Sequence, residues 1–188
     1  MSEHAAQLLE TAEAQIDELI VLFSRHGEAA LSLPCPGREK LGDGTVGALA
    51  LHTAGNYLRI AGFLQATSQM PAAQPGRHWI PRPLRARSHT PHRHAKGGHD
   101  DATHDGNYEA ENVDLPNLLE RLSSGRENLS LLGDMTDEQL DTPPPAGSFK
   151  FCDGQRTLEQ VMSGLLNHQR RQIDAMEAAV TSRTRPAR

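Results

Sequence analysis

Hydrophobic residues recur at helical spacing along the first part of the chain. From about Glu3 to Ala30 most of them lie three or four positions apart with acidic residues between them, so one amphipathic helix is predicted there. Its predicted buried positions are Leu8, Ala12, Ile16, Leu19, Phe23 and Ala30. A second helix is predicted from Thr45, a candidate N-cap, to about Thr67, with a buried stripe at Leu49, Thr53, Tyr57, Ile60 and Leu64.

The helical pattern stops between Ser68 and about Asn112. This stretch holds five prolines, clustered arginines and histidines, and then an acidic run. Such a composition has no amphipathic period, and we therefore expect residues 70–112 to form a long irregular loop.

A third helix is predicted to open at the N-cap Asp114 and to continue through Leu132. Between it and the last helix, residues 149–155 are expected to form a small extended piece or a hairpin. The Asp153-Gly154 pair suits the turn of such a hairpin.

The last predicted helix starts with a capping box formed by Thr157 and Gln160 and runs to about Val180. Four helices of this size, each with one apolar face, are best buried against one another, so the sequence predicts an all-α four-helix bundle. We expect a single domain over residues 1–180, with the loop inserted at about 70–112, followed by a disordered basic tail at 181–188.

Composition narrows the class of protein. The chain has 188 residues, a formal net charge of -5 and only two cysteines, Cys35 and Cys152. It lacks both an 18-residue apolar run and a basic-then-apolar start, so we expect a cytoplasmic protein without a membrane segment. It also lacks the glycine-rich phosphate loops and the GxSxG and HExxH patterns, which argues against nucleotide-binding, serine-hydrolase and metalloprotease readings.

Polar residues interrupt the core-facing stripes of the second and fourth predicted helices. His52 lies on the second helix, whereas His168 and Gln172 lie one turn apart on the fourth. Residues four apart point to the same side of a helix, so a His and a second ligand at this spacing can share one metal ion. The alternative is that each histidine is a satisfied buried residue or lies at the open end of the bundle.

The same residues resemble the DinB/YfiT-like superfamily. The resemblance lies in Thr45-Val-Gly-Ala-Leu-Ala-Leu-His52, in the stretch from Thr157 to Asn167-His168, and in the long connection between helices two and three. It implies a four-helix bundle in which His52, His168 and a third histidine hold a divalent metal. The third position holds Gln172, and its amide oxygen is a weaker donor than imidazole for Zn, Ni or Fe.

The function that the resemblance implies is that of a metal-dependent S-transferase or isomerase that uses a low-molecular-weight thiol. Its partners would be a small-molecule electrophile and the thiol, and relatives make a homodimer plausible. The alternative is a non-catalytic bundle with a degraded metal site that acts as a binding module. Asn56, one turn after His52, is expected to orient that histidine, to contact solvent in the cleft or to make a polar helix contact.

The predicted loop offers a third class of function. Within sixteen residues it carries half of the ten histidines of the chain, namely His89, His92, His94, His99 and His104, and a tract of this kind can bind transition metals by itself. It also carries a basic run with one tryptophan: Arg77, Trp79, Arg82, Arg85, Arg87, Arg93 and Lys96. The acidic residues after this run and the net charge argue against nucleic acid as the main partner.

Overall fold

The computed structural model describes residues 2–68 and 113–184, and these residues form an all-helical bundle. Its four long helices are α1 (Glu3–His26), α3 (Val46–Ser68), α4 (Leu115–Leu129) and α6 (Leu158–Thr184). Three short elements complete the described part: α2 (Glu28–Leu31), the 3-10 helix η1 (Ser130–Asp134) and α5 (Asp137–Asp141). The predicted all-α bundle is therefore confirmed. The described residues contain one isolated β-bridge, between Pro34 and Thr45, and no strand.

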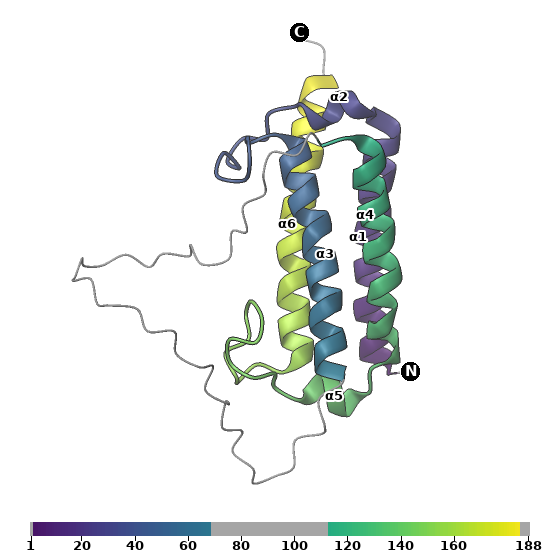
Figure 1. The fold of residues 1–188 in the computed structure, drawn as a ribbon, viewed down its shortest axis with the longest axis vertical. Coiled ribbons are helices and arrows are strands. Elements are labelled where there is room, and N and C mark those ends of the chain that lie inside the picture. Colours follow the sequence, from purple (N-terminus) through teal and green to yellow (C-terminus); the bar gives the residue numbers. More distant parts are fainter. Residues whose placement is uncertain (1, 69–112, 185–188) are drawn as a thin grey trace, which may run out of the picture.

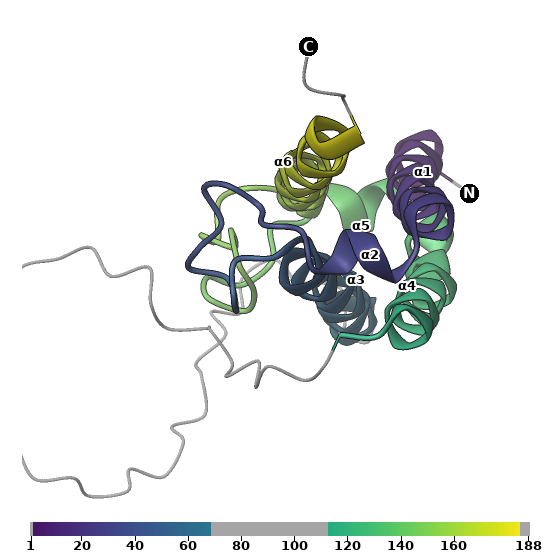
Figure 2. The same cartoon turned by 90° about the horizontal axis from the view of Figure 1, so that it is seen from above.

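The four long helices do not simply alternate in direction. Helices α1 and α6 run one way and α3 and α4 run the other way, as Figure 1 shows. Viewed from above in Figure 2, they form a square in which α3 packs against α4 and α6, and α1 packs against the same two helices. Because α3 and α4 are parallel, the two ends that residues 69–112 join lie at opposite ends of the bundle. The predicted loop at 70–112, with its histidines and arginines, lies outside the described residues.

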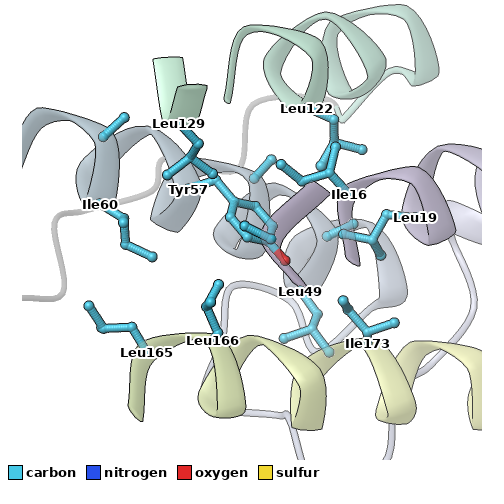
Figure 3. Close-up of a cluster of buried hydrophobic side chains, with 14 of the residues drawn as sticks. Ile16, Leu19, Leu49, Tyr57, Ile60, Leu122, Leu129, Leu165, Leu166 and Ile173 are labelled. Carbon is cyan, nitrogen blue, oxygen red and sulfur yellow. The ribbon is translucent and has the colours of Figure 1, made fainter. Parts of the chain in front are cut away.

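The core contains every apolar position that the helical spacing predicted for the first two helices. Tyr57 lies at its centre, among side chains that come from all four long helices (Figure 3). Two glycines allow close packing at two places in the bundle. A Cβ on Gly125 of α4 would lie 3.1 Å from the Cβ of Tyr57, and a Cβ on Gly47 of α3 would lie 2.9 Å from the carbonyl oxygen of Leu31.

The first helix is shorter than predicted. It ends at His26 because Gly27 has a φ of 63°, a left-handed conformation that does not continue an α-helix, and the Gly27 N–H caps the carbonyl of Phe23. The chain then turns and forms α2, so the prediction of one helix to Ala30 was wrong at this glycine.

The predicted extended piece at 149–155 was also wrong, because these residues form successive turns. The Gly147 N–H donates to the Cys152 carbonyl at 2.8 Å, which folds the segment onto itself. The Asp153 carboxylate accepts the N–H groups of Gln155 and Arg156, both at 2.9 Å. These local side-chain bonds satisfy backbone N–H groups that would otherwise need partners across a hairpin.

The last helix starts as predicted and ends later. Thr157 and Gln160 bond reciprocally at 3.2 and 3.1 Å, which confirms the capping box. The helix continues to Thr184 rather than to about Val180, so 181–184 of the predicted tail are helical, and 185–188 lie outside the described residues. Across the two described ranges, no helix is both long and apolar enough for a membrane span.

Candidate functional site

Buried polar side chains join α3 to α6 near the middle of the bundle. Thr53, Gln169 and Gln172 are almost fully buried, whereas His52 and His168 are half-buried. Since the two helices run in opposite directions, Thr53 lies level with Gln172, and the next turn of α3 lies level with Gln169. The predicted site residues of α6 therefore lie in a hydrogen-bonded helix interface.

Gln172 uses both ends of its amide. Its Oε1 lies 3.0 Å from the hydroxyl of Thr53, and its Nε2 lies 3.1 Å from Nε2 of His168. An amide nitrogen only donates, so Nε2 of His168 accepts and the proton of the neutral ring belongs on Nδ1. The hydroxyl of Thr53 also lies 2.8 Å from the carbonyl of Leu49, so its proton is within reach of two acceptors. These contacts form a continuous chain from His168 to the backbone of α3.

Gln169 anchors the same interface one turn away. Its Nε2 donates to the carbonyl of Thr53 at 3.1 Å, and its Oε1 accepts from the amide of Asn56 at 3.2 Å. The oxygen of Asn56 accepts from the guanidinium of Arg59. Asn56 therefore makes the polar helix contact that was one of the roles expected for it.

These contacts involve the atoms of Gln172 and His168 that would have to bind a metal ion. The Gln172 oxygen is bonded to Thr53, and the acceptor nitrogen of His168 faces the Gln172 amide, so the pair is arranged as donor and acceptor rather than as two ligands. In this arrangement the Gln172 oxygen is engaged by Thr53, and the ligand set of His52, His168 and Gln172 stays a prediction. Within residues 2–68 and 113–184, no three His, Cys, Asp or Glu side chains form a group that could hold a metal ion.

His168 lies in a positively charged environment. Burial lowers the pKa of its imidazole, and the charges of Lys150, Arg171 and Arg38 lower the pKa further. The ring packs edge-on against Phe151, with 6.4 Å between the ring centroids. His168 consequently lies beside an aromatic ring in an environment that favours its neutral form.

Two connections bring these cations to α6. Arg38, from the 32–45 connection, donates its guanidinium to the carbonyl of Arg171 at 3.4 Å. Lys150, from the 142–157 connection, places its Nζ 5.5 Å from the centroid of the Phe151 ring. Figures 1 and 2 both show the two connections on the same side of the α3–α6 pair.

Both cysteines of the chain are buried. Cys35 has its Sγ 3.8 Å from the carbonyl of Ala175, and burial raises the pKa of its thiol. Cys152 lies inside the turns of the 142–157 connection. A thiol needs a lowered pKa to be reactive at neutral pH, so a structural role fits Cys35 best.

Several polar residues were not predicted from the sequence. Gln15 of α1 is buried and bonds to Tyr57 in the core, and the only sign of this in the sequence is a polar residue at a buried helical position. The cations Arg38 and Lys150 lie in irregular segments, where the spacing of residues along the chain does not predict which side chains lie close together. Arg171 carried no signal that distinguished it from its neighbour Arg170.

Comparisons with protein-family models, curated proteins and solved structures found no match for this chain. The resemblance to the DinB/YfiT-like superfamily therefore stays a prediction from the quoted residues, and the proposals below depend on the geometry of the bundle.

Proposed function

We propose that this chain is a non-catalytic, DinB-like binding module, in which a hydrogen-bonded chain of His168, Gln172 and Thr53 replaces the metal site. The observation that carries the proposal is the position of Gln172. Its amide lies 3.1 Å from one partner and 3.0 Å from the other, so both of its polar groups are bonded within the protein.

Energetics support this reading. Gln172 is 2 % exposed, and turning its oxygen toward a metal would leave the buried Thr53 contact unmade. The Thr53 hydroxyl would keep the Leu49 carbonyl as its acceptor, so the cost is that of one hydrogen bond, about 0.5–1.5 kcal/mol, and a neutral amide oxygen returns little as a ligand for Zn, Ni or Fe. The hydrogen-bonded arrangement is thus the better use of this side chain.

Metal content tests the proposal. Chelator-free protein is incubated with Zn²⁺, Ni²⁺ or Fe²⁺ and analysed by mass spectrometry as wild type and as His168→Ala. A third variant replaces the five histidines His89, His92, His94, His99 and His104 by alanine, which removes metal bound by that tract. We expect His168→Ala to leave the metal content unchanged. One equivalent that persists in the five-histidine variant and disappears in His168→Ala would overturn the proposal.

A second candidate is the metal-dependent thiol transferase or isomerase. The observation that favours it is the lowered pKa of His168, because only a neutral imidazole binds a metal ion. His52 and His168 would hold the divalent ion, which supplies a Lewis acid for the thiol of a small-molecule cofactor. For this candidate, thiol consumption by an electrophile should require added metal and should be lost in both His52→Ala and His168→Ala.

A further inference from the structure

Three cationic side chains from three segments meet around His168. Arg171 belongs to α6 itself, Arg38 reaches α6 from the 32–45 connection at 3.4 Å, and Lys150 lies in the 142–157 connection beside Phe151. Arg38 contacts the backbone of Arg171, Lys150 and His168 both lie against the Phe151 ring, and His168 and Arg171 are three positions apart on α6, so the three cations lie close to the same side of this helix. We call Arg38, Lys150 and Arg171 the cationic cluster.

No member of the cationic cluster forms an ion pair with a carboxylate of the described residues. The next residue along α6 shows the contrast, since Arg170 pairs with Glu18, Asp174 and Glu177. Among the described residues, carboxylates therefore lie within ion-pair distance of Arg170 and none lies within that distance of the cluster, although Glu39 directly follows Arg38 in the chain. Like charges gathered in this way repel each other, and a bound anion would remove the repulsion.

The neighbouring surface is apolar and locally strained. Phe151 has a φ of 70°, a left-handed conformation that costs a residue with a side chain about 1–2 kcal/mol. In that conformation its half-buried ring packs against His168 and lies beneath the ammonium of Lys150. An anion held by the cluster therefore meets an aromatic face, which favours an organic anion over an inorganic one.

We propose that Arg38, Lys150 and Arg171 bind a small organic carboxylate whose apolar part packs against Phe151. The planar guanidinium of Arg38 suits bidentate contact with a carboxylate, and the ammonium of Lys150 adds a point charge. This inference deepens the proposed function, on which it rests, by naming the class of ligand that the module takes.

The imidazole of His168 serves as an internal reporter for the test. Full-length protein is titrated with benzoate, acetate and inorganic phosphate at low salt, and the His168 ring signals are followed by NMR, with His168→Ala for assignment. We expect benzoate to produce a saturable shift and to raise the pKa of His168, because a bound anion favours the charged ring. Acetate should bind more weakly because it lacks the aromatic contact.

Charge variants show whether the cluster is responsible. Arg38→Gln and Lys150→Gln should each weaken benzoate binding at least tenfold. Arg126→Gln removes the same charge from α4, where Arg126 pairs with Asp17, and it should leave binding unchanged. Circular dichroism of each variant checks that the bundle is folded.

Several outcomes would overturn the inference. These are no saturable shift with benzoate, equal weakening by Arg126→Gln, or tighter binding of phosphate than of benzoate. A shift that appears only after Asp100, Asp101 and Asp105 are replaced by asparagine would show that the chain's own acids occupy the cluster. Metal content measured on the same samples keeps the two proposals separate. Metal bound at His168 would contradict the proposed function. If the protein binds neither metal nor benzoate, only this inference is contradicted.

Discussion

The hydroxyl of Tyr57 donates a hydrogen bond to Oε1 of Gln15 across 2.9 Å, inside the core of the bundle. Gln15 in turn donates from Nε2 to the carbonyl of Leu166 at 3.1 Å, so the pair links α1, α3 and α6. Burial raises the pKa of Tyr57, and its phenol therefore remains a donor throughout the neutral range. A polar contact of this kind fixes the positions of three helices that apolar packing alone would leave less well defined.

Removing the donor of this pair should destabilise the bundle. Tyr57→Phe leaves Oε1 of Gln15 buried without its partner, and we expect the free energy of unfolding to fall by about 1–3 kcal/mol. Urea unfolding followed by circular dichroism measures the change. The double variant with Gln15→Leu should lose less than the sum of the two single variants, because no orphaned oxygen remains. Strict additivity would show that the bond contributes nothing.

Two histidine substitutions on α6 should differ in metal affinity. The resemblance predicts that Gln172→His raises affinity if His52 and His168 already converge. The structure leads us to expect only a loss of stability of about 0.5–1.5 kcal/mol, since the change removes the buried contact to Thr53, whose hydroxyl keeps the Leu49 carbonyl as an acceptor. Gly164, one turn on the other side of His168, has open space where a side chain would begin.

We therefore expect Gly164→His to bind Zn²⁺ or Ni²⁺ more tightly than Gln172→His, because the introduced imidazole and His168 would lie on one face of the helix. Calorimetric titration gives both affinities, with Gly164→Ala as the control for the backbone change. At a free metal concentration about 100 times Kd, binding should add about 2.7 kcal/mol to stability. Higher affinity in Gln172→His would instead support the metal-dependent candidate.

The carboxylates on either side of Arg170 should affect stability in opposite directions. The bond to Arg170 lowers the pKa of Glu18 below its usual 4.5, so its stabilising contribution is present above pH 4.5 and is lost as pH falls through the lowered value. Burial, and then the neighbouring Glu18, raise the pKa of Glu177 above the same usual value of 4.5. The stability associated with Glu177 is complete below pH 4.5 and is lost as pH rises through the raised value.

At pH 7, Glu18→Gln should therefore lower the free energy of unfolding and Glu177→Gln should raise it. Both effects should stay within about 1 kcal/mol, as for other partly exposed ion pairs. Urea titrations at pH 7 and at pH 4 measure them, and the effect of Glu177→Gln should vanish at the lower pH. Two changes of the same sign at pH 7 would contradict the assignment.

The conformation of Phe151 makes a further prediction. Phe151→Ala and Phe151→Gly both remove the ring, but only glycine adopts a φ of 70° without strain. We expect the glycine variant to be more stable than the alanine variant by about 1 kcal/mol. Thermal and urea unfolding of the two proteins compare them directly. Both should bind benzoate equally poorly, and equal stability would show that the left-handed turn stores no strain.

The helices and most of the core follow from the order of residues along the chain. Leu8, Ile16, Leu49 and Ile60 are buried where the helical period places them, and Thr157 caps the last helix as its neighbours indicate. These features are local, because each depends on residues within one or two turns. The break at Gly27 is local as well, but a glycine near a helix end is compatible with both continuation and termination, and only the observed left-handed φ of Gly27 shows that the helix ends there.

The order of residues along the chain is enough to predict an all-α bundle, its buried stripes and the presence of His168 and Gln172 on one face of a helix. What these residues contact depends on how the helices and their connections pack. Gln172 meets Thr53 because α3 and α6 run in opposite directions at a fixed register, and Arg38 and Lys150 reach His168 because two irregular connections fold onto the same side of α6. Helical spacing predicts which side chains of one helix point the same way. The hydrogen bonds and charge interactions of the site join different elements, and the distances between those elements cannot be read from the order of residues.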